Sequence, residues 1–266
     1  MTDILVANNV SKTYFDTVEK DNVVALQGLS LAVRAHEFVS VIGPSGCGKS
    51  TFLRIVAGLD RPTSGEILVS GSKVTGPGAD RGMVFQEYAL LPWKTTEANI
   101  EFGLRLKGMA KAERQAITQR FVDLVGLTGF EKKYPHQLSG GMRQRAAVAR
   151  VLANNPTVLL MDEPFAAVDA MTRQRLQEEL TAITAHERTT VLFITHAIEE
   201  AVFLSDRVVA LSGRPGRIVA NLVIDLPRPR KWDDVVRDER FAAYRDQLTQ
   251  SIHSNGPANG AAKVSA

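Results

Sequence analysis

The run GPSGCGKST at residues 43–51 constrains this chain more than any other feature. It matches the pattern G-x-x-x-x-G-K-[ST], in which glycines allow a tight turn and backbone N–H groups converge on phosphate oxygens at a helix N-terminus. Residues 37–42 before it form a short apolar run typical of a strand, and residues 49–57 have helical spacing. A strand, a glycine-rich loop and a helix in this order predict a phosphate-binding loop.

Two side chains of this loop have separate expected roles. Lys49 is placed to reach the β- and γ-phosphates of a nucleotide, and the Ser50 hydroxyl is placed to coordinate Mg²⁺. The motif as a whole predicts these nucleotide-binding residues: Gly43, Pro44, Ser45, Gly46, Cys47, Gly48, Lys49, Ser50 and Thr51.

The only cysteine of the chain, Cys47, falls inside the loop. A single cysteine excludes a disulfide within the chain. One interpretation is a small residue that fits the loop, and the other is a redox switch whose thiol pKa is lowered by the helix N-terminus. We expect the side chain to face the phosphate cradle, so that a bulky maleimide on the thiol would block nucleotide binding.

A pair of adjacent carboxylates follows another apolar run. The segment VLLMDEP covers residues 158–164, and its first four residues are typical of a buried strand. Asp162 and Glu163 would then lie at the carboxyl end of this strand, which is the ligand-binding edge of an open α/β sheet. Asp162 offers oxygen ligands to a metal ion, directly or through water, and Glu163 is free to orient and polarise an attacking water.

The order of the remaining apolar patterns predicts an α/β fold. Strands are expected at residues 23–33, 65–69, 82–85, 157–161, 190–194, 207–211 and 217–223. Helices are expected at residues 95–127, 140–154, 170–186 and 197–204. Ser139 stands where an N-cap of the second of these helices is needed. The alternation after Pro156 is typical of a parallel sheet with crossover helices.

Composition limits the class of protein. Hydrophobic residues make up 44% of the chain, and no apolar run reaches the roughly 18 residues of a membrane span. The start of the chain lacks a basic segment before an apolar one, so we expect no signal peptide and a location in the cytoplasm. The net charge of +3 is scattered, which indicates solvated surface charge, with weak attraction to an anionic membrane as the next alternative. No nucleic-acid partner is expected, although Arg228, Arg230 and Lys231 form one small basic group.

The run LSGGMRQR at residues 138–145 is much rarer than the phosphate loop. It resembles the signature motif of ATP-binding cassette (ABC) ATPases, and the resemblance extends over about residues 5–223. It implies a P-loop NTPase (RecA-like) core with a mixed, largely parallel sheet, a helical subdomain and a short N-terminal antiparallel β region. The ABC ATPase domain would span residues 1–226, with the helical subdomain at about 90–155, and a C-terminal tail would follow at 227–266.

The tail turns polar at about Pro227. It contains Trp232, Phe241 and Tyr244, which are expected in an amphipathic helix. The last residues, SNGPANGAAKVSA, are rich in Gly, Ala, Asn and Ser and are expected to be disordered.

The resemblance assigns roles to residues outside the loop. Tyr14 in VSKTY matches the aromatic residue that stacks on adenine, with simple packing as the alternative. Gln86 in VFQEY matches the residue that senses Mg²⁺ and water and links the site to a membrane partner. His196, after the run VLFIT, matches the switch histidine that contacts the γ-phosphate. The resemblance thus implies the catalytic residues Glu163, His196 and Gln86 and the Mg²⁺ ligands Ser50, Gln86 and Asp162.

In the ABC family the signature closes over the nucleotide of a partner subunit, so the resemblance implies a homodimer that encloses two Mg·ATP. The Ser139 hydroxyl and the backbone N–H groups of Gly140 and Gly141 would meet the γ-phosphate bound by the other subunit. Gln144 is a further expected signature contact. Asp169 in AAVDA matches the loop that touches the opposite subunit.

Three segments resemble the corresponding segments of ATPase subunits from bacterial nitrate, sulfonate and taurine importers. They are ALLPWKT after Gln86, MRQR in the signature, and AVFLSDRVVALSGRPGRI after His196. This resemblance implies integral membrane permease subunits as partners, a periplasmic solute-binding protein as an indirect one, and a peripheral location on the cytoplasmic face of the inner membrane. Leu91 and Trp93 are the expected permease contacts. Leu91 precedes a proline, which favours an extended loop, and Trp is enriched among binding hot spots.

Two other functions stay open. One is a soluble ABC ATPase that acts on ribosomes or DNA, but such proteins carry two cassettes or long coiled-coil insertions, and neither is seen in this sequence. The other is an ATP-dependent binding switch with little hydrolysis. Glu163 argues against the switch, and a turnover assay would decide.

Overall fold

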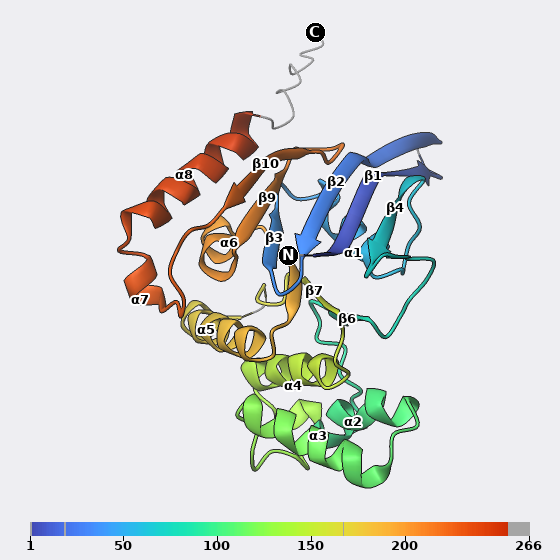
Figure 1. Cartoon of the computed structure of the whole chain (residues 1–266), viewed down its shortest axis with the longest axis vertical. Coiled ribbons are helices and arrows are strands. Elements are labelled where there is room, and N and C mark those ends of the chain that lie inside the picture. Colours follow the sequence, from blue (N-terminus) through green and yellow to red (C-terminus); the bar gives the residue numbers. More distant parts are fainter. Residues whose placement is uncertain (1, 19, 167, 255–266) are drawn as a thin grey trace.

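Two sheets and a separate group of helices form the structure (Figure 1). The computed structural model describes residues 2–18, 20–166 and 168–254. The six-stranded sheet has the order β10-β9-β3-β8-β7-β6, and the four-stranded sheet has the order β2-β1-β4-β5. This arrangement confirms the expected fold class of a largely parallel core sheet with a helical region and an antiparallel β region.

The six-stranded sheet carries the phosphate loop and the acidic pair at the same edge. Its strands are β3 (Phe38–Ile42), β6 (Arg81–Val84), β7 (Val158–Asp162), β8 (Thr190–Ile194), β9 (Arg207–Leu211) and β10 (Ile218–Val223). All neighbours pair in parallel except β9 and β10, which are antiparallel. Every residue of β3 and β8 is buried, which explains why these strands are apolar except for Ser40 and Thr190.

The four-stranded sheet is antiparallel and larger than the short region expected. It contains β1 (Asp3–Asp16), β2 (Asp21–Arg34), β4 (Ser64–Val69) and β5 (Ser72–Lys73). Helix α1 (Lys49–Val56) packs between this sheet and the core sheet, and its apolar side chains share one core with both of them. The phosphate loop, which precedes α1, is therefore held by both sheets.

The helical region forms the lower part of Figure 1 and lies beside β6. It consists of α2 (Thr96–Leu106), α3 (Lys111–Leu124), the short 3₁₀ helix η1 (Pro135–Gln137) and α4 (Gly140–Leu152). Ser139 caps α4 as expected, because its hydroxyl accepts a hydrogen bond from the Met142 N–H at 3.3 Å.

The residues expected as a tail form helices that pack on the core sheet. Helices α7 (Trp232–Val235) and α8 (Glu239–Ser254) follow α5 (Ala170–His186) and α6 (Ile198–Leu204), and α8 contacts α6, β9 and β10. Phe241 and Leu248 belong to the main core, and the Trp232 ring lies 5.0 Å from that of Phe203. The expected disorder concerns residues that, apart from Ser254 at the end of α8, lie outside the described ones.

Arg230 differs from the solvated surface charge expected of most basic residues in this chain. Its side chain is buried, and its guanidinium donates hydrogen bonds to the carbonyls of Val202, Phe203 and Ser205 at the end of α6. Burial lowers the pKa of this guanidinium to about 10. The carbonyls at a helix C-terminus need donors, and Arg230 satisfies this need while it ties the last helices to the domain.

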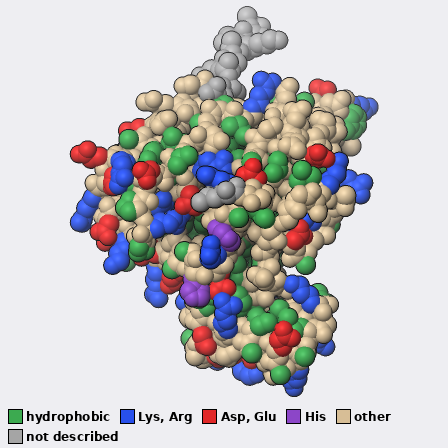
Figure 2. All heavy atoms as spheres, viewed as in Figure 1, with side chains coloured by type: hydrophobic (Ala, Val, Ile, Leu, Met, Phe, Trp, Pro, Cys, Tyr) green, Lys and Arg blue, Asp and Glu red, His purple; other side chains and the backbone are tan. Residues whose placement is uncertain are grey.

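The surface agrees with the limits set by composition. Within the described residues, none of the helices is both long enough and apolar enough to pass through a bilayer. On the face shown in Figure 2, basic and acidic side chains are interspersed.

Candidate functional site

The phosphate loop runs from the end of β3 into α1, as its motif predicts. Gly43, Gly46 and Gly48 have φ values of 155°, 74° and 101°, a region that favours glycine. Gly48 is the N-cap of α1, and no side chain caps the helix. A helix N-terminus without a side-chain acceptor offers its N–H groups and its dipole to an anion.

Lys49 is the buried cation of this loop. Its ammonium group donates hydrogen bonds to the carbonyls of Gly43 at 2.8 Å and Pro44 at 3.1 Å. The loop thus wraps around its own lysine. A hollow of about 310 Å³ lies over it, lined among others by Tyr14, Ser50 and Glu163.

Cys47 differs from the expectation. Its side chain is 1% exposed and belongs to the core beneath the loop, with the thiol turned toward Gly43 and away from the hollow. Burial raises the pKa of the thiol, so a reactive thiolate is disfavoured. The redox interpretation finds no support in this geometry, and a small residue that fits the loop explains it.

Tyr14 stands at the entrance of the same hollow with a partly exposed ring. Its hydroxyl donates a hydrogen bond to Asp60 at 2.7 Å, and the Lys12 ammonium lies 4.7 Å from the ring centroid. Burial, followed by the hydrogen bond to Asp60, raises the pKa of this hydroxyl. These contacts hold the ring beside the phosphate loop, where the hollow offers it to a ligand.

The acidic pair lies across from the loop. The Ser50 hydroxyl donates a hydrogen bond to Asp162 at 3.0 Å, which joins two of the three expected Mg²⁺ ligands. Burial raises the pKa of Asp162, although the hydrogen bond from Ser50 opposes this shift. The Glu163 carboxylate oxygen Oε2 lies 2.9 Å from His196 Nδ1, so two of the three expected catalytic side chains are in contact. The structure thus brings Ser50, Asp162, Glu163 and His196 together.

Gln86 lies two residues after β6, whose end pairs with β7 beside the acidic pair. Its side chain is exposed at the same edge of the sheet. This position agrees with the expected role without establishing a contact.

The signature run occupies another surface, and among the described residues that line the hollow none belongs to it. Ser139 is exposed and Gly140 half-buried at the start of α4, while Asp169 is exposed and caps α5 by accepting from the Thr172 N–H at 3.0 Å. Gln144 corrects the expectation, because its side chain is 2% exposed. It lies one helical turn after Gly140 on a buried face of α4, so this geometry gives no support to a side-chain contact with the nucleotide of another subunit.

Sequence reasoning missed Arg214, which lines the hollow beside the phosphate loop. The available signal was its place in the turn between two expected strands, next to the ligand-binding edge of the sheet.

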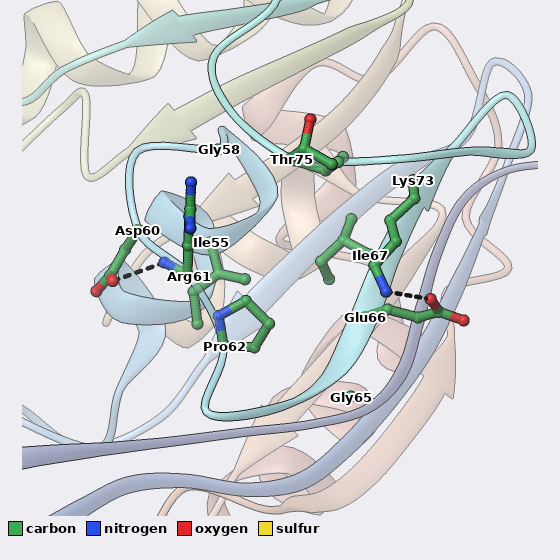
Figure 3. Close-up of a pocket in the computed structure, with 11 residues that line it drawn as sticks. Ile55, Gly58, Asp60, Arg61, Pro62, Gly65, Glu66, Ile67, Lys73 and Thr75 are labelled. Carbon is green, nitrogen blue, oxygen red and sulfur yellow. Dashed lines mark hydrogen bonds and ion pairs between the residues drawn. The ribbon is translucent and has the colours of Figure 1, made fainter.

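A second hollow, of about 370 Å³, lies between the end of α1 and strands β4 and β5 (Figure 3). Three of its charged groups already have partners: Lys73 pairs with Glu66 at 3.0 Å, and Asp60 accepts from the Arg61 N–H at 2.7 Å (Figure 3). The Asp60 carboxylate also accepts hydrogen bonds from Lys12 and Tyr14, so it is this side chain that connects the second hollow with the first.

A family model described as ABC transporter matches residues 26–166, which include the phosphate loop, the signature run and the acidic pair. The chain belongs to the ABC transporter family. It is an ATPase of this family, and the resemblance to ATPase subunits of nitrate-type importers is confirmed by its relatives.

Three relatives illustrate this ABC membership. An uncharacterized ABC transporter ATP-binding protein of Methanocaldococcus jannaschii is 55% identical over 86% of this chain and 84% of the relative. The nitrate import ATP-binding protein NrtD of Synechocystis sp. is 49% identical over 88% of this chain and 90% of the relative. The bicarbonate transport ATP-binding protein CmpC of Synechococcus elongatus is 44% identical over 93% of this chain but only 38% of the relative.

Solved structures agree with membership in the ABC family. A dimeric ATP-binding cassette in a post-hydrolysis state, bound to ADP and phosphate, is 33% identical and has a TM-score of 0.72. The match covers 84% of this ABC chain and 100% of the other.

Proposed function

We propose that this chain is the ATP-hydrolysing subunit of a bacterial importer that takes up a small anion or sulfonate-type solute, of the nitrate, taurine or aliphatic sulfonate class, through a separate permease. The observation that carries the proposal is the 49% identity to a nitrate import ATP-binding protein over 90% of its length. The relative named for bicarbonate transport supports the broader class of small anions.

The contacts of the site support a hydrolytic role for its residues. Tyr14 stacks on adenine, and Lys49 moves from the loop carbonyls to the β- and γ-phosphates. Glu163 orients and polarises the attacking water, and His196 holds that carboxylate in place while it contacts the γ-phosphate. Gln86, two residues after the end of β6, senses the bound Mg²⁺ and the attacking water.

The residues present also fit Mg²⁺. Ser50 and Asp162 supply neighbouring oxygen atoms, which are the ligands that this ion prefers, and Gln86 offers a further oxygen at the same edge. Bound Mg²⁺ neutralises charge on the β- and γ-phosphate oxygens. The hydrogen bond between Ser50 and Asp162 keeps the two ligands together.

Two copies of the chain form the working unit. The cassette with 33% identity was solved as a dimer, which supports this assembly. Ser139, Gly140 and Gly141 of one copy contact the γ-phosphate held by the other, and Asp169 touches the opposite copy. The unsatisfied N–H groups at the start of α4 favour such an anion.

The permease binds beside the helical region. Leu91 lines a hollow of about 450 Å³ together with Phe102 and Leu106, and Trp93 is exposed nearby. Through this contact the chain stays peripheral on the cytoplasmic face of the inner membrane, and a periplasmic solute-binding protein delivers the solute to the permease from the other side.

Deletion and complementation test the proposal. Loss of the gene should abolish growth on one of nitrate, taurine or an aliphatic sulfonate as the only nitrogen or sulfur source. The wild-type chain should restore growth and Lys49→Ala should not. Normal growth on all three, with a defect only when bicarbonate is limiting, would overturn the nitrate, taurine and sulfonate class and leave only the broader class of small anions. ATP hydrolysis by the purified chain without any uptake defect would favour an ABC ATPase that is not coupled to transport.

A further inference from the structure

Arg214 is an exposed cation held beside the phosphate loop by the turn between β9 and β10. It lines the same hollow of about 310 Å³ as Lys49, Ser50 and Glu163. Among the described residues, no carboxylate lies within 4.0 Å of its guanidinium, and the one hydrogen bond found is from Nε to the Gly46 carbonyl. At 3.4 Å that bond is long for an N–H···O contact.

Hydrogen bonds within the turn hold the backbone on both sides of Arg214. The Ser212 N–H donates to the Arg217 carbonyl at 2.9 Å, and the Ser212 hydroxyl accepts from the Arg217 N–H at 3.0 Å. The same hydroxyl is 2.9 Å from the Pro215 carbonyl. These bonds close the turn on both sides of Arg214, so its backbone position is defined before any ligand binds.

The same turn is also packed against the phosphate loop and β2. The Gly216 N–H donates to the Ala25 carbonyl at 2.9 Å, and the Gln27 N–H donates to the Gly216 carbonyl at 3.0 Å. A Cβ added at Gly216 would lie 2.1 Å from the Cys47 carbonyl, so only glycine allows the two backbones to approach this closely. These contacts hold Arg214 beside the phosphate loop.

We infer that Arg214 is a further nucleotide-positioning residue whose guanidinium binds phosphate oxygens of the bound nucleotide. The inference rests on the ATP site proposed above. A guanidinium without a carboxylate partner pairs readily with phosphate, because its planar donors match two phosphate oxygens at once. Lys49 and Arg214 would then hold the phosphates from the two sides of one loop, the first buried and the second exposed.

Nucleotide binding by Arg214→Gln tests this role, with equilibrium titrations of ATP, ADP and adenosine. We expect the dissociation constants for ATP and ADP to rise about tenfold, since a charge-assisted hydrogen bond is lost, and that for adenosine to stay unchanged. Arg214→Lys should recover part of the affinity. The melting temperature should not change, because the bond to Gly46 is long and exposed.

Arg61→Gln is the matched control. It removes another exposed arginine, which lines the hollow of Figure 3, so it changes the net charge in the same way and should leave nucleotide affinity unchanged. An equal loss for Arg61→Gln, or an equal loss for adenosine, would overturn the inference. Unchanged ATP affinity in Arg214→Gln would also overturn it. Failure of the ATP site itself is distinguished by Lys49→Ala, which would then bind ATP as well as the wild-type chain.

Discussion

His196 Nδ1 lies 2.9 Å from Glu163 Oε2, and this contact joins the ends of two neighbouring strands. Asp162 at the end of β7 is in register with Ile194 at the end of β8, and the Glu163 N–H donates to the Ile194 carbonyl at 3.0 Å. Glu163 itself has a φ of 43°, uncommon for a residue other than glycine. Such backbone strain persists where the surrounding structure holds it and is concentrated at functional sites.

Glu163→Gln should bind ATP but hydrolyse it about 10²–10⁴-fold more slowly, because the carboxylate that orients water is lost. The phosphate and metal ligands are left in place, so an ATP-bound dimer should accumulate. Phosphate release measures the first effect and gel filtration with Mg·ATP the second. Wild-type turnover in this variant would remove Glu163 from its proposed role.

His196→Ala should slow hydrolysis by about 10²-fold, because misplacing a catalytic group by about 1 Å has a cost of this size. ATP affinity should change little. His186→Ala is a matched control, since His186 Nδ1 lies 2.8 Å from Glu187 in a similar pair on α5, away from the hollow. Equal loss of turnover in both variants would assign the effect of His196→Ala to stability.

The buried strands and the phosphate loop could be predicted because their patterns are local. The strand β1 could not, since its pairing with β2 shifts register and polar Asn8 and Asn9 interrupt the apolar pattern. An irregular strand of this kind has no clean period of two.

The direction of side chains and the packing of distant segments could not be predicted from the sequence either. The loop motif defines the backbone path but not that Cys47 faces the core, and helical spacing did not reveal that Gln144 is on a buried face. Arg230 looks like surface charge in a polar tail. Only the fold shows that it meets the carbonyls at the end of α6.

The buried thiol of Cys47 should resist modification in the native protein. Its burial and raised pKa both oppose reaction with a maleimide or a disulfide reagent, with or without ATP. The thiol should react fully after denaturation. Fast labelling of the native chain, prevented by ATP, would show that the side chain reaches the phosphate cradle after all.

Glu37 makes stability depend on pH. Burial acts to raise its pKa, but hydrogen bonds from the Arg207 guanidinium at 2.8 and 2.9 Å and from the Arg34 N–H together hold it below the usual 4.5. A lowered pKa in the folded state stabilises the protein above pH 4.5, and this contribution is lost as the pH falls through the folded value.

Glu37→Gln should therefore lower the free energy of unfolding at pH 7 by about 3 kcal/mol, since it leaves Arg207 partly buried without its charge partner. The difference from the wild type should shrink below pH 4.5. Urea unfolding at several pH values measures it. Glu66→Gln, which breaks an exposed pair with Lys73, should have little effect. A difference for Glu37→Gln that does not change with pH would contradict this assignment.

Trp93 is 70% exposed, and the loop that carries it is held by hydrogen bonds to one buried side chain. Asn99 is buried beneath it; its side-chain oxygen accepts from the Leu91 N–H at 2.8 Å, and its side-chain nitrogen donates to the carbonyls of Leu91, Lys94 and Thr95. A large exposed indole on a fixed loop is suited to bind a partner, because little conformational entropy is lost on association.

Trp93→Ala should therefore weaken assembly with the permease and abolish transport, with unchanged ATP binding and a change in unfolding free energy within about 0.5 kcal/mol. Co-purification with the permease and uptake in cells measure the two effects. Phe15→Ala removes another exposed aromatic side chain, which is 63% exposed and lies on β1 in the four-stranded sheet. This variant should alter neither assembly with the permease nor uptake. Because Asn99 fixes the loop from below, loss of the indole leaves the loop in place. A large fall in melting temperature would instead mean that Trp93 stabilises the fold, and unchanged assembly and uptake would place the permease elsewhere.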